Sequence, residues 1–315
     1  MDVLSDILDL LKFRGSLYFA TEFSAPWGIQ VPRFQNVARF HLATGGDCWV
    51  NVAGSSEPVL LSSGDMIIIP HGASHTLSDR LDTPIVGLDT ALETSGYTGD
   101  GHFVYGGADG GHSNLVCGHF EFDSNFNHPL LADLPSFILI RGKKAVEFSW
   151  FESAMRYMSY ETGMSNMGNQ AVIKRLSEIL FIHAVRVWSA EDGFQNGFLR
   201  AVGDKNVGRS LKSFHDTPEA AWTIDLLAVE AGLSRSVFAD RFRKLMNLTP
   251  MQYVTLWRMQ KACRFLIESD LSTDSIAEKV GYQSLASFSK VFKKIIGTGP
   301  GAFRKVKSAT EGVSV

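Results

Sequence analysis

The chain has 315 residues, of which 45 % are hydrophobic and 20 % are charged, and its formal net charge is −3. This length is typical of two domains, and the composition excludes a largely disordered chain. No apolar run approaches the roughly 20 residues of a membrane span, and residues 1–15 lack the features of a secretory signal. The three cysteines include no CxxC pair and are too few for a disulfide framework, so we expect a cytoplasmic protein without a membrane partner.

The first 126 residues predict a short helix followed by a β-rich domain. Apolar residues at helical spacing predict the helix within residues 1–13. From about residue 17, short apolar runs alternate with Gly, Ser, Asp and Pro turns, at residues 37–42, 48–52, 59–61, 66–69, 85–88 and 115–122. Such closely spaced strands indicate a sandwich or barrel. Residues 96–111 contain seven glycines but no GK[ST] phosphate-binding motif, and they predict a mobile surface loop.

The pattern becomes helical after residue 149. Residues 151–160 predict one helix, and residues 169–190 predict a second helix that is apolar on two faces. One face carries Ile173, Leu176, Leu180, Ala184, Val187 and Trp188, and the other carries Val172, Ile179, Ile182 and Val185. A helix that is apolar on two sides must bury both. We therefore expect it to form a symmetric homodimer interface together with residues 149–161.

Charge is divided unevenly along the chain. Residues 205–307 hold 17 Lys and Arg against 9 Asp and Glu, whereas the remaining residues hold 13 against 24. A basic C-terminal third on an acidic body is typical of a nucleic-acid-binding module joined to another domain. Solvated surfaces with uneven charge could give the same charge counts, so the sequence motifs are needed to distinguish the two interpretations.

The basic third contains an internal repeat. Asp225, Ala228 and Gly232 match residues 49 positions later, and Phe238, Phe242, Asn247, Pro250 and Tyr253 match residues 50 positions later. Each copy predicts a helix, a turn at Gly232 or Gly281, and a second helix that begins after Ser234 or Ser284. Two helix-turn-helix units in register within a basic segment favour DNA binding over a purely structural repeat.

The outer face of the second helix in each copy is the predicted DNA-reading surface. In the first copy it carries Arg235, Ser236, Ala239, Asp240 and Arg243. In the second copy it carries Ser284, Leu285, Ala286, Ser289, Lys290 and Lys293. Residues early in such a helix contact base edges in the major groove, and its basic residues contact phosphates.

Residues 222–305 resemble the tandem helix-turn-helix domain of AraC/XylS-type transcription regulators, most closely in IAEKVGY and SFSKVFKK of the second copy. The resemblance implies a helical module that places two recognition helices in successive major-groove segments. Ala239 and Asp240 depart from the long polar donors often present at these positions, and an acidic Asp240 repels phosphate. The operator sequence therefore cannot be deduced.

Residues 64–75 resemble the second motif of cupins, a family of small β-barrels, with the spacing G-x5-P-x-G-x-x-H. The resemblance implies that His75 is a metal ligand. The first cupin motif would supply two His and one Glu, but only His41 is present, so the usual ligand set is incomplete. His71, His112 and His119 could join His75 and Cys117 in a transition-metal site, or they could be scattered polar residues on the barrel.

We expect an effector site in the barrel at His41, His71, His75 and Cys117, since a barrel mouth is a common ligand site. A small organic molecule, a metal ion and an oxidant remain possible signals, in that order of preference. Cys117 lies in an apolar run, where a cysteine is more often a small buried hydrophobe than a redox switch.

The sequence thus predicts an α+β protein of two domains. A cupin-like β-barrel covers residues 1–135, a helical connector and dimerisation segment covers 136–204, an all-α tandem helix-turn-helix domain covers 205–308, and a tail covers 309–315. The predicted function is a non-enzymatic, sequence-specific transcription regulator, expected to be an activator, with double-stranded DNA, a small effector and RNA polymerase as partners. The alternative is a cupin metalloenzyme, of dioxygenase or isomerase type, with an accessory DNA-binding domain. The two differ in whether a full metal-ligand set is present.

Overall fold

The computed structural model describes residues 2–11, 13–99, 101–108, 110–122, 128–142, 149–162, 166–190 and 197–311. The chain divides into two compact units, which are described separately. The sheet unit comprises Phe13–Asp123 and Leu134–Glu191. The helical unit comprises Met1–Lys12, Ser124–Asp133 and Asp192–Val315.

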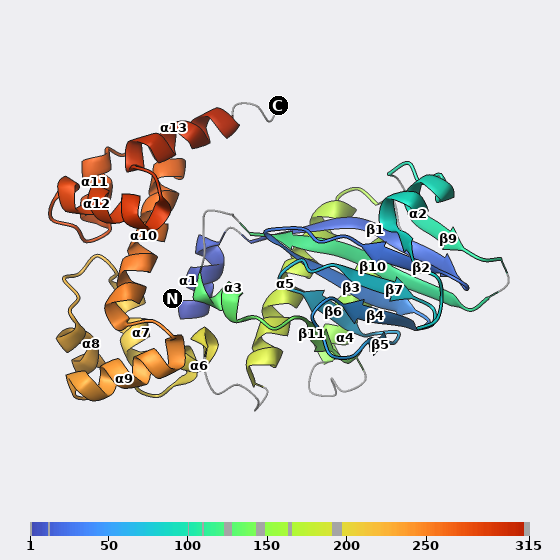
Figure 1. Ribbon diagram of the computed structural model, residues 1–315, viewed down its shortest axis with the longest axis horizontal. Helices are drawn as coiled ribbons and strands as arrows, with labels where there is room; N and C mark the ends of the chain where they lie inside the picture. Colours follow the sequence, from blue (N-terminus) through green and yellow to red (C-terminus); the bar gives the residue numbers. More distant parts are fainter. Residues whose placement is uncertain are drawn as a thin grey trace. The chain divides into compact units, whose positions relative to one another are not determined.

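The sheet unit consists of two sheets that share one apolar core (Figure 1). The first sheet has the order β11–β6–β3–β10–β1–β9, with strands β1 (Arg14–Ser24), β3 (Val37–Gly45), β6 (Met66–Ile69), β9 (His102–Gly106), β10 (His112–Glu121) and β11 (Ile138–Ile140). The second has the order β5–β4–β7–β2–β8, with strands β2 (Gly28–Val31), β4 (Cys48–Val52), β5 (Val59–Leu61), β7 (His75–Ser78) and β8 (Val86–Gly87). Phe23 and Ile67 from the first sheet pack in one cluster with Val50 and Leu77 from the second.

Within its described residues, the sheet unit also contains the helices α2 (Leu88–Ser95), α4 (Ser149–Thr162) and α5 (Asn169–Ala190). Helix α5 packs against β1, and the ring of its Phe181 lies 4.9 Å from that of Phe120 in β10. Its two predicted apolar faces differ in burial, because Leu180 is fully buried whereas Ile179 is 49 % exposed. The first face therefore belongs to the core of the sheet unit, whereas the second is mixed, because Ile179 is exposed and Val185 is buried.

The helical unit contains α1 (Val3–Leu10), α3 (Pro129–Asp133), α6 (Phe198–Gly203), α7 (Val207–Asp216), α8 (Ile224–Ala231), α9 (Arg235–Met246), α10 (Pro250–Glu268), α11 (Thr273–Lys279), α12 (Leu285–Ile296) and α13 (Pro300–Glu311). Helix α10 connects the two repeats and buries Tyr253, Trp257 and Cys263 in the core. A capping box at Thr249 and Gln252 begins this helix, with Pro250 in its first turn. None of the described helices is long and apolar enough to cross a bilayer.

The structure confirms most of the predicted elements and corrects one. The helices predicted in residues 1–13, 151–160 and 169–190 are present, as are strands at the predicted apolar runs, except that residues 85–88 contain only the two-residue β8 and the start of α2. The predicted surface loop at 96–111 is wrong in part, because β9 lies within it and pairs in parallel with β1. Glycines flank this strand and obscure it, but Phe103 between them is fully buried in the core. The predicted tail begins within α13, and residues 312–315 lie outside the described residues.

The compact units do not follow the expected domain boundaries. Met1–Lys12 and Ser124–Asp133 belong to the helical unit, although they were expected in the barrel domain. Helix α1 packs against α7 and α10, burying Val3, Ile7 and Leu10. The apolar face of α1 was visible in the sequence, but the surface that covers it was not.

Candidate DNA-binding surface and buried histidine–cysteine cluster

Helices α8 and α9 form the first helix-turn-helix unit. Thr223 caps α8 by accepting from the backbone N–H of Leu226, and Gly232 ends it in the left-handed region with φ +66°. A side chain at Gly232 would be strained there, since L-residues rarely adopt this conformation. Phe238 and Phe242, one turn apart on α9, are buried and hold the opposite face of α9 outward.

Helices α11 and α12 form the second unit by the same means. Ser272 caps α11, Gly281 takes a φ of +80° in the turn, and Ser284 caps α12 by accepting from the N–H of Ser287. Phe288 and Phe292 are fully buried. The predicted turn glycines and core phenylalanines therefore occupy the same positions in both repeats.

The side chains predicted to read DNA lie on the open faces of α9 and α12. Nine of the eleven are exposed: Arg235, Ser236, Asp240, Arg243, Ser284, Leu285, Ala286, Lys290 and Lys293. Ala239 and Ser289, at equivalent positions of the two repeats, are half-buried. The register of both helices thus places the predicted set on accessible surface.

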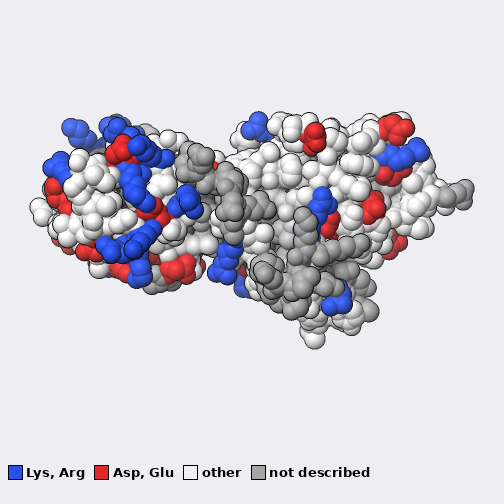
Figure 2. Space-filling model, turned by 90° about the horizontal axis from the view of Figure 1, so that it is seen from below, with Lys and Arg blue, Asp and Glu red and all other residues white. Residues whose placement is uncertain are grey.

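The two recognition helices differ in how their charges are paired. On α9, Arg235 forms an ion pair with Asp225 at 3.3 Å, and Lys244 forms one with Asp240 at 2.9 Å. On α12, Lys290, Lys293 and the neighbouring Lys294 make no ion pair within the described part of the chain. Figure 2 shows Lys and Arg side chains gathered on one face of the helical unit, with Asp and Glu between them. Helix α12 therefore carries the larger unneutralised positive charge.

In the sheet unit, three of the predicted effector-site residues form a buried hydrogen-bonded chain. His75 Nδ1 lies 2.9 Å from the carbonyl oxygen of Ala73. A carbonyl can only accept, so His75 Nδ1 carries the proton and donates. In the neutral ring its Nε2 must then accept from Nε2–H of His41, 2.7 Å away. His41 Nδ1 is left to accept from the Cys117 thiol at 3.1 Å.

The surroundings of this chain favour neutral side chains throughout. Burial, then the neighbouring His75 and Arg39, hold the pKa of His41 well below its ordinary value. Burial lowers the pKa of His75 to about 4, although its hydrogen bond to Ala73 opposes the shift. Burial also raises the pKa of the Cys117 thiol, with a smaller contribution from Cys48. A thiol rather than a thiolate faces His41, so Cys117 is a weak nucleophile in this state.

The cavity beside the chain is small and mainly apolar. Its volume is about 20 Å³, and Phe19, Phe103, Arg39, His41 and Cys117 are among its lining residues. This is about the room that one water molecule needs. An organic effector could enter only if side chains moved.

The remaining predicted ligands lie elsewhere. His71 is exposed and donates to the Leu134 carbonyl at 2.8 Å. His112 hydrogen-bonds with Ser24, and His119 with Glu121. Among the described residues, no three His, Cys, Asp or Glu side chains converge in a way that would hold a metal ion. The proposed transition-metal site, with His75 as a ligand, therefore has no assembled ligand set in that part of the chain.

Sequence reasoning missed a second buried polar network, in the helical unit. His215 Nδ1–H donates to Asp6 at 3.3 Å, and the Tyr253 hydroxyl donates to His215 Nε2 at 2.8 Å. The backbone N–H of Leu130 donates to His128 Nδ1, so His128 Nε2–H points at the Tyr253 oxygen, 3.4 Å away. Each residue lies on a different segment, and no local motif indicated that they would meet.

A sheet unit with a cupin-type strand motif and a helical unit with two exposed, basic recognition helices together define a DNA-binding transcription regulator. Comparison with known proteins agrees. A cupin family model matches residues 2–190, and a helix-turn-helix domain model matches residues 227–306.

The chain belongs to the AraC-like transcription regulators. It is 30 % identical to a putative AraC-like transcription regulator of Streptomyces lividans, over 97 % of this chain and 98 % of that protein. It is 27 % identical to the HTH-type transcriptional regulator AlkR of Acinetobacter baylyi, over 97 % of this chain and 99 % of AlkR. A solved structure of the DNA-binding domain of AdpA with a target DNA is 28 % identical, covers 35 % of this chain and 99 % of that one, and has a TM-score of 0.33.

Proposed function

We propose that this chain is a cytoplasmic, homodimeric transcription activator that contacts RNA polymerase and responds to a small signal received in its cupin domain. The observation that carries the DNA-binding part is the pair of helix-turn-helix units with recognition helices of equal length and equivalent register, whose predicted DNA-reading side chains are mostly exposed. We propose no catalytic role for the barrel, because the relatives matched along the whole chain are transcription regulators.

On DNA, the residues that begin each recognition helix are placed to contact base edges, and the lysines of α12 to contact phosphates. Asp240 is held by Lys244, which reduces its repulsion of phosphate. Binding should therefore depend more on α12 for electrostatic attraction and more on α9 for base contacts through Arg235.

Selection of bound sequences from a random DNA pool by the full-length protein tests this division. We expect Arg235→Ala to relax sequence preference at one position, at a cost of about 1–3 kcal/mol. Lys293→Ala should weaken binding to all sequences alike. Lys279→Ala, on the exposed side of α11, is the matched control and should bind as the wild-type protein does. Specific binding that survives deletion of residues 205–315 would refute the assignment.

The homodimer is proposed to form through α4 and α5. Tyr157, Tyr160 and Ile179 are large apolar side chains that remain exposed on these two helices. Leu180 on the other face of α5 is not a usable probe of the interface, because it is fully buried and its substitution would unfold the sheet unit. Ile179→Asp is the better test. Sedimentation should find monomers for this variant and dimers for the wild-type protein, and a stable wild-type monomer at high concentration would contradict the proposal.

The signal is proposed to act on the His41–His75–Cys117 chain. These three side chains are buried and neutral, and the cavity beside them has room for one water molecule. Any event that adds charge or volume there should therefore destabilise their present arrangement strongly. Such an event can alter DNA binding only by favouring one arrangement of the protein over another.

A reporter assay with the full-length protein tests the site and separates the three classes of signal. Small organic molecules, Zn²⁺ and hydrogen peroxide form the three arms. We expect His75→Ala and Cys117→Ser to reduce the reporter response to whichever class of signal activates the wild-type protein. His71→Ala should leave this response unchanged, because His71 is exposed and lies outside the hydrogen-bonded His41–His75–Cys117 group. If both variants fold and respond as the wild type does, the signal site lies elsewhere.

A further inference from the structure

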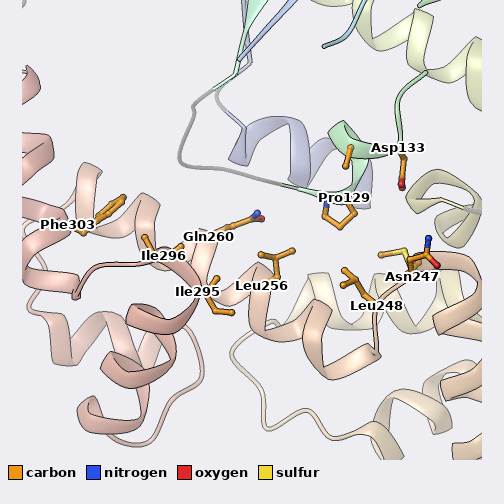
Figure 3. A pocket seen from close by; sticks show the side chains of 11 residues that line it. Pro129, Asp133, Asn247, Leu248, Leu256, Gln260, Ile295, Ile296 and Phe303 are labelled. Atoms are coloured by element: carbon orange, nitrogen blue, oxygen red, sulfur yellow. The ribbon is translucent and has the colours of Figure 1, made fainter. Parts of the chain in front are cut away.

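The helical unit contains an open cleft of about 590 Å³ that the DNA-binding surface does not use (Figure 3). Leu256 and Gln260 from the middle of α10 line it, together with Ile295 at the C-terminal end of α12. Helix α3 contributes Pro129 and Asp133. A volume of this size is typical of sites for small organic molecules.

One polar side chain that lines this cleft has no hydrogen-bond partner within the described structure. Gln260 is 1 % exposed, and neither the oxygen nor the nitrogen of its side-chain amide makes a hydrogen bond within the described structure. Figure 3 shows its side chain extending into the cleft toward the side where Pro129 lies. A buried amide without partners is costly, so this amide favours any molecule that supplies both an acceptor and a donor.

The charge of the cleft favours a neutral ligand. Asp133 is the charged side chain among the described lining residues, and its Oδ2 accepts from the backbone N–H of Phe198 at 2.6 Å. No Lys or Arg lines the described cleft. A carboxylate ligand would therefore meet a like charge without a balancing cation.

We propose that this cleft binds an uncharged, mainly apolar organic molecule carrying an amide or lactam group, which pairs with the Gln260 amide. An amide presents one donor and one acceptor side by side, which matches the two free atoms of Gln260. An ester offers an acceptor alone and leaves the Gln260 oxygen without a partner.

A molecule bound in the cleft would contact both helix-turn-helix units. Met246, at the end of α9, and Ile296, at the end of α12, both line it and occupy equivalent positions of the two repeats. A molecule held between them and α10 contacts the ends of both recognition helices. Binding of the molecule therefore changes the affinity of the protein for DNA. This effect on DNA binding rests on the proposed function, whereas binding of the molecule in the cleft does not.

Calorimetric titration of the full-length protein without DNA tests the site, using octanamide, methyl octanoate and octanoate as probes. We expect octanamide to bind about tenfold more tightly than methyl octanoate, on the order expected for a buried hydrogen bond, and octanoate to bind least. Gln260→Leu should abolish the preference for the amide, and Leu256→Trp should weaken binding of both neutral probes by narrowing the cleft beside Gln260. Gln170→Leu makes the same chemical change at an exposed site of α5 and should keep the wild-type preference.

Failure of octanamide to bind, tighter binding of octanoate, or a preference for the amide that survives Gln260→Leu would overturn the proposed ligand class. Gln260→Leu should also raise the melting temperature of the ligand-free protein, since it removes an unpaired buried amide, and a fall would show that the amide has a partner. With DNA present, saturating octanamide should change DNA affinity on the order of fivefold or more. Ligand binding without this change would refute the coupling alone.

Discussion

Acid should destabilise the sheet unit through His75, and His75→Gln should remove this effect. His75 is buried as a neutral ring, and its pKa falls from the ordinary 6.5 to about 4. Between these values the unfolded chain binds a proton that the folded chain does not. Stability is therefore fully present above pH 6.5 and is lost as the pH falls toward 4.

The size of the effect follows from the two pKa values. Their difference corresponds to about 3 kcal/mol of unfolding free energy. His41 adds a further loss in the same direction, because its pKa is also lowered by burial. In the His75→Gln variant the glutamine keeps a donor for the Ala73 carbonyl but carries no titrating group, so the contribution of His75 disappears.

The pH dependence of the unfolding free energy of the sheet unit can be measured in the full-length protein by urea unfolding, followed through hydrogen exchange of β3 and β10 peptides. Near neutral pH, we expect His75→Gln to be less stable than the wild type by about 1 kcal/mol, the worth of an imperfectly replaced hydrogen bond. As the pH falls, the wild-type curve should descend more steeply and the two curves should converge or cross. His71→Gln, at an exposed position, should follow the wild-type curve. Parallel wild-type and His75→Gln curves would refute the reasoning.

Three further predictions concern the helical unit. Lys290→Ala should lower the slope of log affinity against log salt by about 1, in DNA-binding titrations over a range of salt, because Lys290 is exposed and makes no ion pair among the described residues; an unchanged slope would contradict a phosphate contact. Phe288→Ala should destabilise the helical unit by about 3–5 kcal/mol in chemical denaturation, since the ring is fully buried, whereas Leu285→Ala on the exposed side of α12 should have little effect. Tyr253→Phe should cost about 1–2 kcal/mol by leaving His215 and His128 without their shared hydroxyl, and calorimetric melting that shows no loss would argue that water replaces it.

Local patterns were sufficient for the recognition helices. Gly232 and Gly281 mark turns that need a left-handed residue, and Phe238 and Phe288 mark the buried faces. Because these signals act within about twenty residues and occur twice, the repeat predicted both units and their outer faces. The bounds of α5 were predicted for the same reason, since helical periodicity is a local property.

Contacts between distant segments could not be predicted in this way. Strand β9 was missed because its pairing with β1 joins residues far apart in the sequence, and its flanking glycines resemble a loop. The meeting of Asp6, His215, Tyr253 and His128 depends on how four segments pack, and none of them carries a motif.

The sequence by itself determined the class of this protein, because helix caps, turn glycines and apolar spacing specify the tandem helix-turn-helix units locally. It also named His41, His75 and Cys117 as candidates. The tertiary structure decided that these three form one hydrogen-bonded chain, since β3, β7 and β10 bring them together. It also decided that α1 belongs to the helical unit and that Gln260 lies unpaired in a cleft. The partners that a buried side chain meets come from segments far apart in the sequence, and no local pattern encodes them.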